Sequence, residues 1–416
     1  MKDVIIQINR ILNDMNRLVL IGNGFDLAHD LKTSYKDFIY WYWKQRVTGL
    51  HNVAHTLSYD SLCELEILNG EYWSTFYFRN SMSLKKKNGE ELYKFLTKHK
   101  DTFRIGYTPF FGNIHKSLET KRWVDIENEY YSLLTEFAIR SKSEEKVAKL
   151  NQQLAYIKEL LITYLTQINK IDIQPINTIK TKIYAPINKF EVAIGWQKNL
   201  KEYIDWSLEQ GKDYWRMKYG DSIAYSDIDE YKSDPKADYP RCFMTPDNIM
   251  LLNFNYTRTA ELYVTNRSNV TVNYIHGYLS DPESVIFGYG DELDKDYPLL
   301  KEVKDDACLR NVKSINYHNS DNYRKFLDFI ESGPYQVVIM GHSCGNSDRT
   351  LLNTLFEHPN CISIKPYFYQ IDEENDKYLE LVQSIHRNFK DMKMMRDRVV
   401  NKRYTEPLIR FKKNTL

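Results

Sequence analysis

The sequence predicts an α/β protein, Rossmann-like, with a mostly parallel sheet and a large α-helical insertion. Apolar runs that suit buried strands occur near the start and throughout the second half of the chain, with helix-like segments between the later ones. The middle of the 416-residue chain instead has helical periodicity. We therefore predict a discontinuous nucleotide-binding core of residues 1–66 and 246–416 around a mainly helical insertion of residues 67–245.

The strands of the core are predicted from runs that are apolar on successive residues, as in strands covered on both faces. Helical spacing of apolar residues over 348–358 and 377–389 places helices between the last strands, which indicates a parallel arrangement. The predicted strands cover residues 17–22, 248–254, 270–277, 284–288, 336–341 and 367–371.

The insertion is predicted from amphipathic segments with a period near 3.6 and no intervening strand of comparable quality. A stretch rich in Asp, Pro and Lys at 225–248 is predicted to be the loop that returns to the sheet. The predicted helical segments cover residues 87–99, 123–140, 143–170 and 196–210.

Composition excludes several classes of protein. Lys and Arg number 57 against 56 for Asp and Glu, and this balance gives no clear nucleic-acid signal. We expect no signal peptide and no membrane span, hence a cytoplasmic protein, because charges interrupt the apolar pattern at the start and no long apolar run follows. The five cysteines are far apart, so neither a disulfide framework nor a zinc site is predicted.

The first predicted strand ends in Gly22-Asn23-Gly24, and Phe25 and Asp26 follow. A strand that runs into Gly-x-Gly can bring its backbone close to a phosphate or ribose. The full dinucleotide fingerprint is absent, because no third glycine stands three residues after Gly24 and no acid follows at the usual distance. A nucleotide-binding turn and a plain tight turn both remain open, and Asp26 could simply balance a helix dipole.

Polar residues also follow the next two predicted strands. Asn253 and Asn255 alternate, which places them on one face, and Thr257 is predicted to cap a helix. His276 and Gly277 end the following strand. Because the carboxyl ends of parallel strands meet at one edge, where α/β sheets bind ligands, we expect these residues to lie near the first glycine loop. A structural role for His276 remains open.

The segment GHSCG at 341–345 matches the G-x-S-x-G nucleophile elbow of hydrolases. That alternative needs an acid, Asp372 or Asp376, and then His386, and little chain remains to complete such a fold. In the other interpretation, the Ser343 hydroxyl and the backbone amides before Asp348 face a phosphate.

A metal-dependent nuclease would need clustered carboxylates, and VDIENE at 124–129 is the candidate. Asp125 and Glu129 would share one face of a helix, for which a solvated surface is the simpler interpretation.

These motifs together resemble the AbiH family of phage abortive-infection proteins, over nearly the whole chain. More distantly, the pattern of strand ends is similar to that of sirtuin-like NADase domains of antiphage systems. The quoted motifs are LIGNGFDLAH, the W-x-D-I-E run from Trp123 to Glu127, LNFNYT, IHG and the late GHS-x-G-x-SD.

This resemblance implies an effector that depletes NAD by cleaving its nicotinamide–ribose bond without a metal. It assigns catalysis to His276 and Asn255, and Asp26 would replace the acid that Thr257 displaces. The implied nucleotide contacts are Gly22, Asn23, Gly24, Phe25, Asn253, Gly277, Gly341, Ser343 and Asp348.

Two further hypotheses stay open: a catalytically silent nucleotide-binding sensor or scaffold, and a different hydrolase or nuclease. The expected partners are a nucleotide, NAD as substrate or ligand, a phage-derived trigger and a second copy of the chain. We expect the insertion to gate the pocket or to mediate assembly.

Overall fold

The structure is a computed structural model that describes residues 15–49, 57–68, 86–121, 125–220, 223–234, 237–265 and 269–411. The chain forms two compact units. The sheet unit consists of Met1–Asp30, Asp172–Val285 and Tyr317–Leu416, and the helical unit consists of Leu31–Ile171 and Ile286–Asn316. These boundaries differ from the predicted core and insertion, since residues 31–66 belong to the helical unit and residues 172–245 to the sheet unit.

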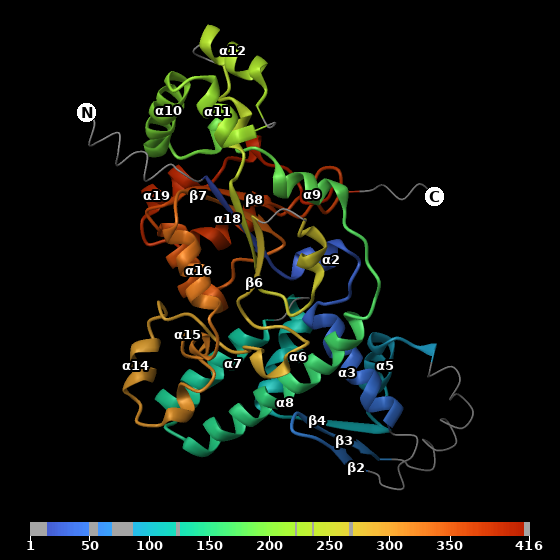
Figure 1. Ribbon diagram of the computed structural model, residues 1–416. Helices are drawn as coiled ribbons and strands as arrows, with labels where there is room; N and C mark the ends of the chain where they lie inside the picture. Colours follow the sequence, from blue (N-terminus) through green and yellow to red (C-terminus); the bar gives the residue numbers. More distant parts are fainter. Residues whose placement is uncertain are drawn as a thin grey trace. The chain divides into compact units, whose positions relative to one another are not determined.

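The sheet unit contains a five-stranded parallel sheet with the order β6-β5-β1-β7-β8. This finding confirms the predicted α/β class with a mostly parallel sheet. Figure 1 labels strands β6, β7 and β8 of this sheet. The first strand is central, the next two follow on one side and the last two on the other, so the order reverses between β1 and β7. Open α/β sheets bind ligands at such a switch point. The strands are β1 (Asn16–Ile21), β5 (Asn248–Asn253), β6 (Val270–Tyr274), β7 (Tyr335–Met340) and β8 (Cys361–Tyr367).

The register of the sheet aligns the carboxyl ends of its strands. Ile21 pairs with Asn253 on one side and with Met340 on the other, and Asn253 pairs with Tyr274. The loops that follow β1, β5, β6 and β7 therefore all leave from one edge of the sheet. We call this edge the carboxyl edge and the opposite one the amino edge.

Two predicted strands are wrong. Residues 284–288 are no strand: η6 (Pro282–Ser284) is a 3-10 turn, and the residues that follow it carry no strand pairing beyond one isolated bridge at Tyr289. The last strand is β8 and ends at Tyr367, where the predicted strand over 367–371 begins. Pro366 interrupts the strand pattern in the sequence, because proline has no backbone N–H to donate to a neighbouring strand. In the structure β8 is an outermost strand of the sheet, where proline is tolerated.

Helices cover the sheet as the pattern of apolar residues predicts. On one face, Ile179 and Ile183 of α9 (Asn177–Tyr184) pack in the core with Val19, Val338 and Met340. The predicted helices at 348–358 and 377–389 are confirmed as α17 (Arg349–Glu357) and α18 (Tyr378–Arg387), and both contact β8. Further helices of this unit are α16 (Asn322–Glu331), which contacts β6, and α19 (Met392–Arg398).

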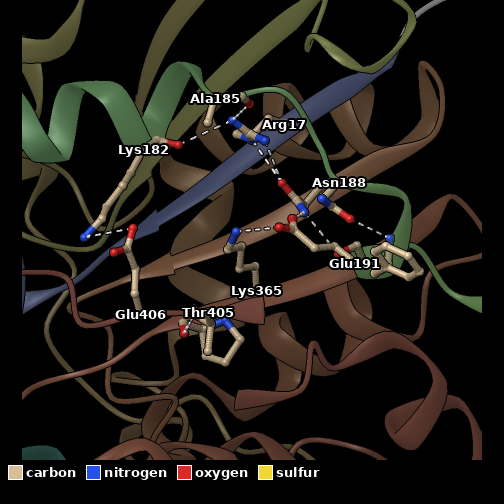
Figure 2. A network of polar contacts seen from close by, with 12 residues as sticks. Arg17, Lys182, Ala185, Asn188, Glu191, Lys365, Thr405 and Glu406 are labelled. Carbon is tan, nitrogen blue, oxygen red and sulfur yellow. Dashed lines mark hydrogen bonds and ion pairs between the residues drawn. The ribbon is translucent and has the colours of Figure 1, made fainter. Parts of the chain in front are cut away.

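A buried polar network holds the end of α9 at the amino edge (Figure 2). We call it the Arg17 network. The Arg17 guanidinium donates to Gln336 Oε1 through Nε at 3.2 Å and through Nη2 at 2.8 Å, and its Nη1 donates to the carbonyls of Ile183 at 2.8 Å and Ala185 at 2.6 Å. These carbonyls belong to the last turn of α9 and the residue after it, which have no helical partners of their own.

The Arg17 network continues through Glu191, whose carboxylate is bonded on both oxygens. Gln336 Nε2 donates to Glu191 Oε2 at 2.8 Å, and Lys365 Nζ donates to Glu191 Oε1 at 2.5 Å (Figure 2). The three side chains come from β7, from η3 (Lys189–Glu191) and from β8. Two strands are thereby joined to the segment that follows α9.

The predicted loop at 225–248 is wrong, because it contains α12 (Tyr225–Ser233) and α13 (Arg241–Met244). Tyr231, Phe243 and Met244 are buried against α10 (Ile194–Glu209), with α11 (Lys212–Tyr219) between α10 and α12 in the chain. Asp229 and Lys232, which suggested a loop, lie on the exposed side of α12.

The helical unit contains the predicted amphipathic helices at 87–99, 123–140 and 143–170, whereas the one at 196–210 is α10 of the sheet unit, and the helical unit adds a small sheet. Strands β2 (Leu57–Tyr59), β3 (Cys63–Ile67) and β4 (Phe103–Tyr107) form an antiparallel sheet, and β4 lies between predicted helices of the insertion, where no strand of comparable quality was expected. The strands escaped notice because they are short and partly exposed. The helices are α3 (Tyr35–Gly49), α5 (Gly89–Lys98), α6 (Pro109–Lys121), α7 (Ile126–Thr135), α8 (Glu144–Ile168), α14 (Tyr297–Glu302) and α15 (Lys313–Asn316).

None of the helices in the described residues has the length and apolar character that spanning a membrane requires.

Candidate functional site

The predicted site residues all belong to the sheet unit and come from loops at its carboxyl edge. The loop after β1 begins at Gly22 and enters α2 (Asn23–Ala28), which contains Asp26. Asn255 follows β5, His276 follows β6, and Asp348 ends the 3-10 helix η9 (Asn346–Asp348) after β7. The loops on the two sides of the switch point, after β1 and after β7, both carry glycines.

The glycines of these two loops allow the loops to pack against each other. Gly341 has a φ of +77°, and a Cβ there would lie 2.1 Å from the backbone nitrogen of Phe25. A Cβ on Gly24 would lie 2.8 Å from Cα of Gly341, and one on Gly22 would lie 2.6 Å from Cα of His342. Glycine is therefore required at these positions because the two loops pack closely against each other.

Two of the backbone amides that the sequence suggested for a phosphate are already bonded. The amide of Gly24 donates to the carbonyl of Gly341 at 2.8 Å, and that of Phe25 donates to the carbonyl of Gly22 at 2.8 Å. Gly277 has a similar structural reason, since its φ is +79° and a Cβ there would meet the carbonyl of Ser284 at 2.2 Å. The side chain of Asn23 is exposed at the start of α2. Nucleotide contacts from these residues stay predictions.

The two asparagines after β5 organise their own loop. Asn253 accepts from the amide of Asn255 at 3.1 Å and donates to the carbonyl of Thr257 at 3.1 Å, and Asn255 Nδ2 donates to the carbonyl of Gly22 at 3.0 Å. The polar atoms that leave this apolar strand are thus bonded to backbone. Asn255 joins the loops after β5 and β1.

Thr257 does not cap the next helix, contrary to the prediction. The 3-10 helix η5 (Thr259–Tyr263) begins without a side-chain cap, and the Thr257 hydroxyl donates instead to Asp26 Oδ2 at 2.6 Å. The residue that stands in place of an acid after β5 is thereby bonded to the acid after β1. If Asp26 replaces the acid that is missing at position 257, the two side chains must lie close together, and this hydrogen bond meets that condition.

Asp26 is a buried carboxyl group at this edge with a raised pKa. Its side chain is 1% exposed, and Oδ1 has no hydrogen-bond partner. Burial raises the pKa of Asp26 to about 6, although hydrogen bonding from Thr257, with smaller contributions from Thr259 and Asn255, opposes the shift. A buried acid with an open oxygen and a pKa near neutrality is typical of a functional site.

His276 lies in a second cluster, which surrounds Phe254. Its Nε2 is 3.3 Å from Asp348 Oδ1 and 3.3 Å from the Tyr317 hydroxyl. The Phe254 ring contacts the imidazoles of His276 and His342, with centroids 5.1 Å and 4.2 Å away. His276 is 4% exposed and Asp348 8%, so both belong to the interior of the site.

His342 is the residue of this cluster that the sequence analysis missed. Its Nε2 lies 3.6 Å from Asp348 Oδ2, and its Nδ1 accepts from the amide of Cys344 at 3.0 Å. The sequence predicts roles for the serine and the backbone of GHSCG and none for its histidine. Asp348 was assigned to a nucleotide, whereas its carboxylate faces two histidines.

The structure gives the hydrolase alternative no support. Ser343 is exposed, and no hydrogen bond among the described residues joins it to His386. The carboxylate of Asp372 binds Asn375, and that of Asp376 binds Lys402. Burial and the charge of Asp348 raise the pKa of Cys344 far above its usual range, so its thiol stays protonated.

The candidate nuclease carboxylates lie in the helical unit and serve its structure. Asp125 is the N-cap of α7, and Glu129 accepts from the Ser117 hydroxyl at 2.6 Å. Among the described residues, no group of three or more His, Cys, Asp or Glu side chains is arranged to hold a metal ion. Glu127 accepts from the amide of Gly288 and from Lys313, both at 3.0 Å. Trp123 of the same motif lies outside the described residues.

The fold and the site define a Rossmann-like α/β protein with a polar, partly buried cluster at the switch point of its sheet. The chain belongs to the AbiH family: the description "Bacteriophage abortive infection AbiH" matches residues 18–370. Its role is therefore in abortive-infection defence against bacteriophage. No curated protein and no solved structure matches the chain.

Proposed function

We propose that the protein is an effector that hydrolyses the nicotinamide–ribose bond of NAD. The observation that carries this proposal is Asp26, a buried carboxyl group with a raised pKa and an oxygen without a partner at the switch point of the sheet. Its hydrogen bond from Thr257 places it beside the strand end from which the corresponding acid is missing. The substrate class is taken from the resemblance of the strand-end motifs in the sequence to those of sirtuin-like domains.

The proposed reaction needs a leaving group, a stabilised cation and a water. The bond between ribose C1′ and the nicotinamide nitrogen breaks, and nicotinamide leaves with the electron pair. Water then forms the new bond to C1′ and gives up a proton, which yields ADP-ribose. Ionised Asp26 would favour the developing positive charge on the ribose, and His276 would take the proton from the water.

Asn255 has a supporting role in this proposal. Its Nδ2 is bonded to the carbonyl of Gly22, so it fixes the loop of Asp26 relative to the strand that precedes Phe254. The side chain is only half-buried, and its Oδ1 is the atom that would orient a ribose hydroxyl or the water. The hydrogen bond to Gly22 and the proposed contact with the ribose or the water therefore both come from the side-chain amide of Asn255.

A silent nucleotide sensor is the second candidate, and one observation favours it. The amides of Gly24 and Phe25 are bonded within the protein, so the first glycine loop offers less to a pyrophosphate than a Rossmann loop does. A sensor would bind NAD or a related nucleotide without consuming it.

The test is the loss of NAD over time with purified protein, alone and with lysate from phage-infected cells as the source of a trigger. His276→Gln and Asp26→Asn should each reduce the rate by about 10²–10⁴-fold, as expected for a lost acid–base or charged group. The matched control is His386→Gln, an exposed histidine on α18, which should leave the rate unchanged. Saturable binding without NAD loss under both conditions would support the sensor instead.

A further inference from the structure

The carboxylate of Asp348 faces two histidines at once, one on each oxygen. Oδ1 lies 3.3 Å from His276 Nε2, and Oδ2 lies 3.6 Å from His342 Nε2. All three side chains are at least nine-tenths buried, with exposed fractions of 4%, 6% and 8% for His276, His342 and Asp348. A carboxylate in such a position interacts strongly with the protons of both rings.

The backbone decides which nitrogen of His342 carries its proton. The amide of Cys344 donates to Nδ1 at 3.0 Å, so Nδ1 must hold a lone pair. A neutral His342 therefore has its hydrogen on Nε2, the nitrogen that faces Asp348. Cys344 is held for this contact in a left-handed conformation, with a φ of 52°, and Asn388 Nδ2 donates to its carbonyl at 2.9 Å.

Two histidines and one carboxylate could either bind a metal or form a cluster in which the histidines direct hydrogens at the carboxylate, and this tautomer of His342 favours the second arrangement. A metal would need the lone pair of Nε2, and the Cys344 amide already occupies that of Nδ1. In the neutral ring of His342, Nε2 instead carries a hydrogen, and this nitrogen lies 3.6 Å from Asp348 Oδ2. Asp348 can accept in the same way from His276, and the Tyr317 hydroxyl is the other polar group at His276 Nε2.

We propose that Asp348 is a positioning residue, which holds His276 as the tautomer with hydrogen on Nε2, and that His342 in turn fixes Asp348. The lone pair of His276 is then on Nδ1, which becomes the nitrogen that accepts a proton. The carboxylate stabilises the resulting imidazolium, as an acid does for the base of a catalytic triad. This inference rests on the proposed function for the role of His276 as a base, but its geometry stands apart from NAD.

The test reads the histidine rings directly by ¹⁵N NMR of the imidazole nitrogens in the full-length protein, as a function of pH. His276→Gln and His342→Gln assign the two signals, and His386→Gln is the control. We expect the tautomer with hydrogen on Nε2 for both rings in the wild type. Asp348→Asn should lower the pKa of His276 by about one unit or more, because an opposite charge within ~4 Å is lost.

A second variant guards against misfolding of Asp348→Asn. In His342→Gln, Asp348 loses one donor, so the pKa of His276 should rise while its tautomer is kept. Hydrogen on Nδ1 of His276 in the wild type, or unchanged titrations in both variants, would overturn the inference.

The NAD assay distinguishes the two levels of the proposal. Hydrogen on Nε2 of His276, together with no NAD loss under either condition, removes the NAD hydrolase and keeps the positioning role of Asp348. NAD loss with hydrogen on Nδ1 keeps the hydrolase and removes that role.

Discussion

A charged side chain is buried at the amino edge of the sheet and another at its carboxyl edge, and the two differ in how completely they are hydrogen-bonded. Arg17 at the amino edge is 2% exposed, and its Nε, Nη1 and Nη2 all donate hydrogen bonds. Asp26 at the carboxyl edge is 1% exposed, and one of its oxygens has no partner. Burial alone therefore does not distinguish a structural charge from a functional one, whereas pairing does.

The same desolvation also has different consequences for the two charges. Burial lowers the pKa of Arg17 from 12.5 to about 10, which leaves the guanidinium charged at neutral pH. Burial raises the pKa of Asp26 from 3.8 to about 6, which brings its titration close to neutral pH. The amino edge keeps a fixed charge, and the carboxyl edge has one that can change.

The largest expected effect is at the amino edge. Arg17→Met should lower the free energy of unfolding by about 3–5 kcal/mol, because it leaves Gln336 Oε1 and the carbonyls of Ile183 and Ala185 without their donor. Urea denaturation followed by circular dichroism measures the change as a shift of the midpoint.

Arg258→Met is the matched control for that experiment. Arg258 pairs with Glu261 at the surface, where its side chain is 61% exposed, and such pairs contribute at most about 1 kcal/mol. Equal effects of the two substitutions would show that the Arg17 network is not the support that its hydrogen bonds indicate.

The second effect concerns the glycine loops at the carboxyl edge. Gly341→Ala should cost about 2–4 kcal/mol, because φ is +77° and the new Cβ would lie 2.1 Å from the backbone nitrogen of Phe25. Gly345→Ala is the control in the same loop, since φ is −70° there and the nearest atom is 3.5 Å away. Thermal unfolding compares the two, and a tolerated Gly341→Ala would contradict the close packing of the loops.

The smallest expected effect concerns the hydrogen bond between Thr257 and Asp26. Thr257→Val keeps the shape of the side chain and removes the donor to Asp26 Oδ2, so it should cost about 1–2 kcal/mol at pH 7. The cost should shrink below pH 5, where Asp26 is protonated. It should also shrink in the Asp26→Asn background, and the double-mutant cycle measures the difference. Thr271→Val, at an exposed position of β6, is the control.

Much of the sheet could be predicted from the sequence, because buried parallel strands are apolar on successive residues. β1, β5 and β7 were located to within a residue at each end. β8 was displaced because Pro366 interrupts its pattern, and the three antiparallel strands were missed because they are short and each contains exposed residues. The division into units could not be predicted, since residues 286–316 join the helical unit through contacts that are distant in sequence.

The candidate site was predicted at the level of the sheet edge and not at the level of contacts. Alternation along the strands placed Asp26, Asn255 and His276 at one edge. It could not show that Asp348 faces His276 and His342, because these contacts span more than sixty residues in the one case and depend on a left-handed backbone in the other. Nor could it show that Thr257 binds Asp26.

The measurement that tests the central claim most directly is the stability and the NAD turnover of Asp26→Asn, on one preparation, from pH 4 to pH 8. The unfolded chain loses the Asp26 proton near pH 3.8 and the folded chain near pH 6, so wild-type stability falls between these values as pH rises.

Asn removes this loss. The variant should match the wild type in stability near pH 4, exceed it by about 2–3 kcal/mol at pH 7, and consume NAD about 10²–10⁴-fold more slowly. A variant that is less stable than the wild type at pH 7, or that keeps its turnover, would contradict the assignment of the carboxyl edge to function.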